Sequence, residues 1–171
     1  MESLAPPATH HVIAAIGWME LGNMPEALAE LDKLDPAIQR HADVLEVRWS
    51  ILAAQLDWDS AAKIGRALIA ADPNRPSAWL HHAYALRRAS AGGLVAALNA
   101  LAPVGTKFPN EATIPYNLAC YTCQLQRDPK ETLDWLERAI SIGGRKEIVA
   151  MALRDPDLAP MRGEIEELSK R

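Results

Sequence analysis

The sequence predicts an all-α protein built from about four similar helical hairpins that stack side by side. Three observations carry this prediction: a helix-forming composition, a pattern that recurs about every 34 residues, and a turn signal inside each copy. Hydrophobic residues make up 49% of the 171 residues, charged residues 23%, and the net charge is −4. Alanine is abundant and β-branched runs are scarce, which favours helices. The composition is that of a globular protein rather than a disordered chain.

Small and apolar residues recur in two columns along the chain. The first column holds pairs 34, 36 and 35 residues apart: Ala27-Leu28, Ala61-Ala62, Ala97-Leu98 and Thr132-Leu133. The second column has spacings of 34, 34 and 36 residues and holds Ala15, Trp49, Ala83 and Ala119. Small residues at such positions let two antiparallel helices approach closely, so we assign the second column to the first helix of each hairpin and the first column to the second helix.

Turn signals separate the two helices of each copy, since Gly and Asn tolerate the backbone that ends a helix and Pro cannot continue one. They are Gly22-Asn23, Asp57, Gly92-Gly93 and Asp128-Pro129. The predicted helices cover residues 8–21, 24–34, 41–56, 59–71, 77–90, 93–102, 112–126, 129–141, 145–153 and 160–170. The connection from Ala102 to Pro109 is the least regular.

One hairpin cannot bury its apolar face alone, so three or more must stack to form a continuous core. A plain helical bundle without a repeat is the alternative, and the period held over four copies disfavours it.

Several segments resemble the tetratricopeptide repeat (TPR) family. The segments that carry the resemblance are Leu21–Ala27 at a turn, Ala71–Asn74 at a repeat end, Tyr116–Ala119 on a first helix and Trp135–Ile140 on a second helix. The resemblance covers nearly the whole chain, although Arg48 and His82 stand where the family usually has Leu. It implies a single domain over residues 1–171, a right-handed superhelical solenoid with repeats near 8–36, 41–73, 77–109 and 112–143.

The tail also resembles a known element. Residues 152–162, ALRDPDLAPMR, look like the extension that follows the last repeat in many bacterial TPR proteins. A capping segment over residues 145–171 is physically expected, because the end repeat otherwise leaves an apolar face exposed to water.

The resemblance further implies a concave groove, lined by the first helices, that holds a peptide or a segment of a partner protein. The predicted groove residues are Val12, Ile13, Ile16, Glu20, Val47, Ser50, His81, Tyr84, Arg87, Arg88, Asn117, Cys120 and Gln124. The amino-terminal part of this set is apolar, and the carboxyl-terminal part is polar with two Arg residues that can pair with carboxylates. We therefore expect a partner segment with an apolar anchor and an acidic group. Some TPR domains clamp acidic chaperone tails with Lys, Asn and Arg, and those residues are not reproduced here.

Residues that could support chemistry are few, and we expect no catalytic residue, metal or cofactor. Cys120 and Cys123 form a Cys-x-x-Cys, but they lie in the middle of a predicted helix and no second such pair offers zinc ligands. Adjacent His residues, as in His81-His82, point about 100° apart and do not chelate one metal by themselves. An enzyme or metal protein using Cys120, Cys123 and His81 is left as an alternative.

The expected partner is a protein or a peptide. The small negative charge does not favour nucleic acid as a partner. The apolar stretch that ends at Glu20 is too short to span a bilayer, so no membrane partner is predicted. The sequence therefore predicts a cytoplasmic location. Self-association through an end face is possible. The alternative function is a dedicated chaperone for one client, such as a bacterial secretion chaperone.

Overall fold

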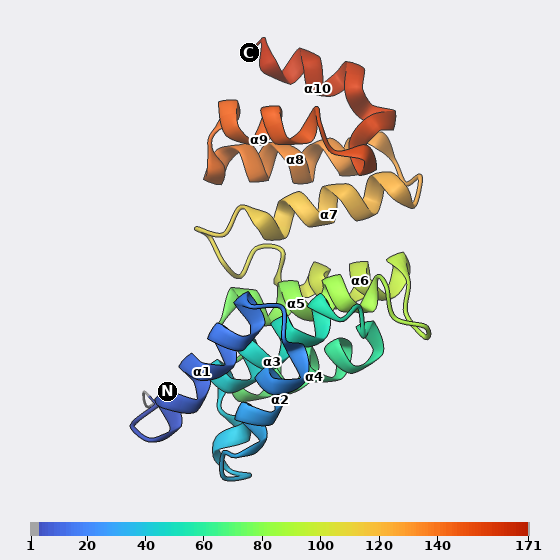
Figure 1. The fold of residues 1–171 in the computed structure, drawn as a ribbon. Helices are drawn as coiled ribbons and strands as arrows, with labels where there is room; N and C mark the ends of the chain where they lie inside the picture. Colours follow the sequence, from blue (N-terminus) through green and yellow to red (C-terminus); the bar gives the residue numbers. More distant parts are fainter. Residues whose placement is uncertain (1–3, 171) are drawn as a thin grey trace. The chain divides into compact units, whose positions relative to one another are not determined.

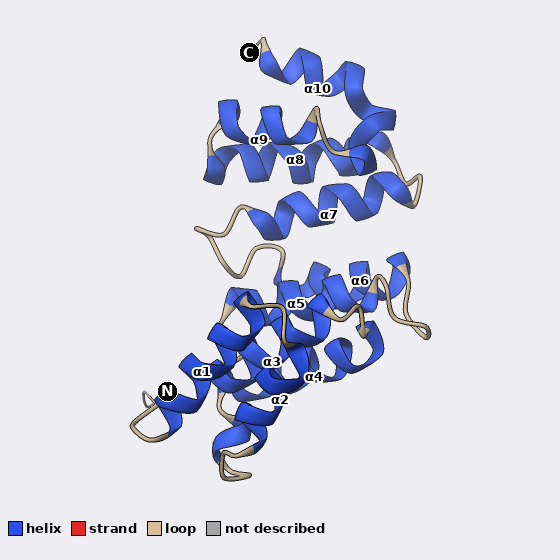
Figure 2. Cartoon of the chain, in the orientation of Figure 1, coloured by secondary structure: helices blue, strands red, loops and turns tan. Residues whose placement is uncertain are grey.

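The structure is a computed structural model that describes residues 4–170, and these residues form helices and loops with no strand (Figure 2). The predicted all-α class is therefore confirmed. The α-helices are α1 (Ala8–Glu20), α2 (Met24–Asp32), α3 (Ala42–Ala54), α4 (Trp58–Ala71), α5 (Pro76–Leu86), α6 (Leu94–Leu101), α7 (Thr113–Gln124), α8 (Pro129–Gly143), α9 (Arg145–Ala152) and α10 (Arg162–Ser169). Three 3-10 helices that the sequence did not predict are η1 (Ile38–Arg40), η2 (Ala102–Val104) and η3 (Pro156–Met161). Within residues 4–170, no helix is long and apolar enough to cross a membrane.

The chain divides into two compact units, residues 1–91 and 92–171, which hold α1 to α5 and α6 to α10 respectively. In unit 1, α1 packs on α2 and α3 packs on α4, and α4 also packs on α5 (Figure 1). The first helices of successive hairpins, α1, α3 and α5, also contact one another in order. In unit 2, each helix from α6 to α10 packs on the next, and η3 returns to pack on α7. The predicted third repeat, residues 77–109, crosses the division between the units, and the single-domain organisation stays a prediction.

Three hairpins share one turn geometry at their midpoints. Gly22, Leu56 and Gln126 all have positive φ, at 77°, 60° and 53°. In each case the N–H of the following residue reaches the carbonyl five positions back, as in the bond from Asn23 N to Trp18 O of 2.8 Å. This is the Schellman motif, which satisfies carbonyls left unpaired at a helix end. The repeat in sequence is thus also a repeat in helix-ending geometry.

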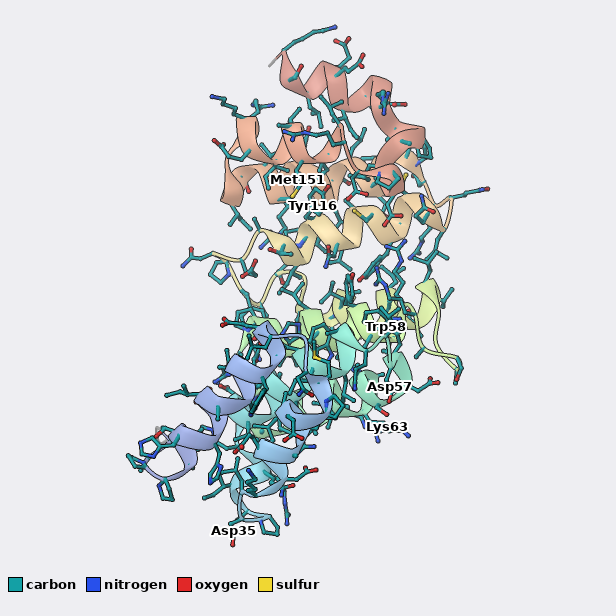
Figure 3. The ribbon with its side chains drawn as sticks, in the orientation of Figure 1. Asp35, Asp57, Trp58, Lys63, Tyr116 and Met151 are labelled. Carbon is teal, nitrogen blue, oxygen red and sulfur yellow. The ribbon has the colours of Figure 1, made fainter. Side chains whose placement is uncertain are left out.

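Three of the second helices, α2, α4 and α8, begin with a side-chain cap. The side chains of Asn23, Asp57 and Asp128 accept backbone N–H groups of α2, α4 and α8 at 3.3, 3.1 and 2.9 Å. Such caps satisfy donors that the first turn of a helix leaves unpaired. Asp57 and the adjoining Trp58 lie at this end of α4 (Figure 3).

A glycine sets the distance between α4 and α5 in unit 1. Gly65 lies four positions after Ala61 of the first repeat column, and a Cβ there would stand 2.7 Å from the Cα of His82. The ring of His82 lies beside α4, with Nδ1 3.0 Å from the carbonyl oxygen of Ala62. Burial lowers the pKa of His82 below its ordinary value, which favours the neutral ring.

In unit 2, α7 is the central helix of the core. Its residues from Ile114 to Cys123 are buried except Asn117. The hydroxyls of Thr122 on α7 and Thr132 on α8 are both fully buried and lie 3.0 Å apart, and Thr122 also donates to carbonyls of its own helix. Buried hydroxyls need such partners, because an unpaired polar group in a core is costly.

The carboxyl end of α5 differs from the prediction. The sequence predicted a helix to residue 90, but α5 ends at Leu86 and residues 87–90 form a turn. The carboxylate of Asp59, next to the start of α4, accepts hydrogen bonds of 2.9 Å from both the backbone N–H and the hydroxyl of Ser90. These bonds hold Ser90 in the turn.

Candidate functional site

An aromatic group lies on α3, α4 and α5 of unit 1, and we call Trp49, Trp58, His81, Tyr84 and Arg88 the Tyr84 cluster. The rings of Trp49 and His81 are stacked, with centroids 3.8 Å apart and planes 9° from parallel. Tyr84 meets Trp49 and Trp58 edge-on at 6.3 and 5.7 Å. These are the geometries that aromatic pairs prefer. Trp49 is buried, but 40% of Tyr84 is exposed, so one side of the cluster is accessible to solvent.

The charged member of the cluster is Arg88. Its guanidinium carbon lies 3.5 Å from the ring centroid of Tyr84 and 5.3 Å from that of Trp58, which are cation–π distances. Its Nη1 donates a 3.1 Å hydrogen bond to the carbonyl oxygen of Tyr84. Arg88 is exposed and has no carboxylate partner within the described part of the chain. Most of its N–H donors therefore face solvent while its flat face lies on aromatic rings.

Beside the cluster, Glu46 on α3 accepts hydrogen bonds from Arg75, which precedes α5, and from Ser77 and His81 in the first half of that helix. Its carboxylate lies 2.7 Å from His81 Nε2, 3.1 Å from Ser77 Oγ and 3.3 Å from Arg75 Nη1. Burial by itself would raise the pKa of Glu46, but the bonds from these donors outweigh it and hold the pKa below its ordinary value. The site of Glu46 therefore favours the carboxylate.

Arg75 links this group to two further carboxylates. Its guanidinium contacts Asp43 at 2.7 Å and Asp72 at 3.4 Å in addition to Glu46. Burial alone would lower the pKa of Arg75, and the bonds to Asp43 and Glu46 raise it instead. Each carboxylate at this end of α3 and α5 thus has a cationic partner inside unit 1, whereas Arg88 has no carboxylate partner in the described part of the chain.

The predicted groove residues of α1 and α3 are placed in different ways. Ile13 is 66% exposed and Glu20 is exposed, whereas Val12 packs against the core of the first hairpin and Ile16 is half-buried.

On α3, Val47 packs against the same core. Ser50 donates from its hydroxyl to the carbonyl oxygen of Glu46 at 3.1 Å. Neither side chain joins the Tyr84 cluster. Of the residues predicted on α5, the structure brings His81, Tyr84 and Arg88 together, and Arg87 is the residue that caps α5. Whether these residues bind a partner stays a prediction.

In unit 2, the predicted face of α7 is covered by the chain itself. Cys120 is buried, and Gln124 donates from Nε2 to the carbonyl oxygen of Asp157 at 2.8 Å. Tyr116, on the same face (Figure 3), donates its hydroxyl to the carboxylate of Asp155 at 2.9 Å. Asn117 is half-buried.

The groups in unit 2 that could hold a cation are Cys120, Asp155 and Asp157, whose ligand atoms lie within 4.8 Å of one another. The carboxylate of Asp155 already accepts from Tyr116 and, at 3.6 Å, from the thiol of Cys120. Cys120 and Cys123 are buried and not joined in a disulfide. Burial and the charges of Asp157 and Glu164 raise the pKa of Cys123, which favours the unreactive thiol form.

A shallow recess opens near the same segment. Its volume is about 470 Å³, and its lining comes from α9 and the residues that follow that helix: Glu147, Met151, Arg154, Asp155 and Pro156. Met151 is 44% exposed there (Figure 3).

Among solved structures, the chain is similar to MamA of Desulfovibrio magneticus RS-1, residues 41 to the end. The TM-score is 0.67, the sequence identity is 17%, and the match covers 98% of each chain. The fold is that of a TPR-like helical solenoid. At this identity the likeness concerns the fold alone. No protein-family model matches the sequence, and no curated protein matches it.

Sequence reasoning missed two parts of these sites. It assigned Trp49 to the packing column, where the structure does bury it, but it did not predict that Trp49 and Trp58 contact Tyr84 or that Arg88 lies over the Trp58 ring. The sequence contained a signal for this contact. Trp49 and Tyr84 are 35 residues apart, close to the repeat length of about 34, so they occupy nearly equivalent positions on neighbouring first helices. Sequence reasoning placed Asp155 and Asp157 in the capping tail, but it did not predict that they contact the groove residues expected on α7. The signal that could have indicated these contacts is the pair of Asp residues that flank Pro156 after the last repeat.

Proposed function

We propose that the chain is a protein-interaction module of the TPR family that binds a peptide or a segment of a partner protein on the Tyr84 cluster, without catalysis. The observation that supports this most directly is the combination of the exposed Tyr84 and Arg88 with the half-buried Trp58 beside them. Tyr, Trp and Arg dominate the binding energy of protein interfaces, because they offer large rigid area and charge-assisted hydrogen bonds. The TPR-like fold, in which first helices line up side by side, gives such a cluster an extended neighbouring surface.

The cluster is also prepared in a way that suits binding. The Tyr84 ring is held by two edge-on partners, and the Arg88 guanidinium is held against that ring. A side chain that is already ordered loses less conformational entropy when a partner binds. The proposal therefore places the main contacts on α5, with Ile13 and Glu20 of α1 as outlying contacts.

The test is site-specific photo-crosslinking in the cell of origin. A photoreactive phenylalanine analogue at position 84 should give a protein adduct, whereas the same analogue at Lys63, which is exposed on α4 (Figure 3), should give little. Equal adducts from the two positions would refute the proposed site. A dedicated chaperone would show itself by a single client captured in stoichiometric amount.

A further inference from the structure

Residues 155–158 cover the predicted groove face of α7 and show which chemical groups bind to a first helix within this protein. Asp155 presents its carboxylate to the Tyr116 hydroxyl and the Cys120 thiol, and the carbonyl of Asp157 accepts from Gln124. The backbone N–H of Asp157 in turn bonds to the Asp155 carboxylate at 2.9 Å, which fixes the segment as a turn. The occupant is thus a short acidic turn, held through oxygen atoms by donors spaced four residues apart on a first helix.

Two of the same three positions exist on α5, and the third lies in the turn that follows this helix. Counting from Ala119 in the repeat column, Tyr116, Cys120 and Gln124 stand three before, one after and five after. Counting in the same way from Ala83, the equivalents are Leu80, Tyr84 and Arg88. In unit 1 these equivalents carry no covering segment, since Tyr84 is 40% exposed and Arg88 is exposed.

At the last of these positions, the side chain that follows α5 is a stronger hydrogen-bond donor than its counterpart on α7. Gln124 offers a neutral amide to a carbonyl oxygen, whereas Arg88 offers a cation with several N–H groups in a planar fork. A guanidinium pairs with a carboxylate by two parallel hydrogen bonds, and such charge-assisted bonds are about twice as strong as neutral ones. At the first position Leu80 stands in place of Tyr116 and offers no hydrogen-bond donor. The donor available to a carboxylate is therefore Arg88, at the third position.

Nearby acidic groups do not compete for Arg88. Glu46 and Asp43 are paired with Arg75, and Asp59 accepts two hydrogen bonds from Ser90. The guanidinium carbon lies close to the rings of Tyr84 and Trp58, and Arg88 is exposed, so N–H donors remain for an incoming group.

We propose that the Tyr84 cluster recognises an acidic turn segment of a partner protein, with a carboxylate of that segment paired to the guanidinium of Arg88 and its apolar part on Tyr84 and Leu80. This inference rests on the proposed function and names the chemistry of the partner. The occupant resembles, in kind, the Asp155-Pro156-Asp157 turn that covers α7.

The experiment titrates the isotope-labelled full chain with the capped peptide Leu-Ala-Asp-Pro-Asp-Leu-Ala and follows backbone amide and indole N–H signals by NMR. Signals of the last turn of α5 and the Trp58 indole should shift in a saturable way. The same peptide with Asn at both Asp positions should bind at least about tenfold more weakly, since one charge-assisted pair is lost. Arg88→Gln should weaken the Asp peptide by a similar factor, whereas Arg66→Gln, the same change at an exposed position on α4, should not.

Equal binding of the Asp and Asn peptides, equal affinity of the Arg88→Gln variant, shifts confined to α7, or no binding would each overturn the inference. Crosslinking from position 84 does not depend on the charge of the partner. If it succeeds while the acidic peptide fails, only the acidic specificity falls. If it fails as well, the proposed function falls too.

Discussion

Replacing Gly65 by Ala tests whether the contact between α4 and α5 limits the packing of unit 1. The new Cβ would lie 2.7 Å from the Cα of His82 and 3.0 Å from its backbone N, where ordinary contacts begin at 3.4 Å. The obstacle is backbone, so one helix must move away by about 0.7 Å at this point. The displacement also disturbs the contact between the His82 ring and the Ala62 carbonyl.

The expected magnitude comes from two opposing effects. Overpacking a core costs about 1–3 kcal/mol, while Ala is favoured over Gly inside a helix by about 1 kcal/mol. The difference between the two effects should lower the free energy of unfolding by up to about 2 kcal/mol. Gly17→Ala is the matched control, because Gly17 also lies in a helix but a Cβ there meets nothing within 4 Å. That change should stabilise by about 0.5–1 kcal/mol.

The assay is urea denaturation followed by tryptophan fluorescence. Four of the five Trp residues lie in unit 1, so the signal reports mainly on the unit that carries both changes. The two variants should move the unfolding midpoint in opposite directions. If Gly65→Ala stabilises the protein as much as Gly17→Ala does, the reasoning about close helix approach is wrong.

Three further changes test other features described above. Leu56→Gly should stabilise unit 1 by up to about 1 kcal/mol in urea denaturation, because Leu56 has φ of 60° and is 69% exposed; an unchanged or lower midpoint would contradict this. The pKa of Glu46 is lowered, so the stability that Glu46 contributes should be present above pH 4.5 and be lost as the pH falls through the lowered pKa. In the Glu46→Gln variant, the urea midpoint should no longer show this decrease at low pH. Identical pH profiles for the variant and the wild type would argue against it. Tyr116→Phe should cost about 1–2 kcal/mol, because Asp155 loses its hydroxyl donor, and thermal unfolding that matches wild type would show that the bond contributes nothing.

The fold was largely predictable because the signals that set it are local. The residues Gly22-Asn23 and Asp57 mark turns that the structure closes with Schellman bonds and side-chain caps, so most helix ends fell within about two residues of the prediction. The end of α5 was placed wrongly for a different reason. Ser90 is held in a turn by Asp59, a residue 31 positions away, and local propensity carries no information about that bond.

The candidate site was predictable only in part. Periodicity placed His81, Tyr84 and Arg88 on one helix, and the structure brings them together. It could not show that Trp58, at the start of another helix, completes the cluster, or that Arg75 gathers three carboxylates. These contacts join side chains of different helices. They depend on how the helices pack and on how far each side chain extends, and periodicity along one helix does not give this information.

The turn from Asp155 to Leu158 has a practical consequence for anyone who shortens this chain. A fragment that stops after α9 would leave the Tyr116 hydroxyl, the Cys120 thiol and the Gln124 amide without the oxygen atoms they contact, on a face that is otherwise dry. Leu158, which is fully buried, would be lost together with these contacts. Expression boundaries chosen for solution work should therefore retain the residues up to the end of α10, because earlier stops invite aggregation and oxidation at Cys120.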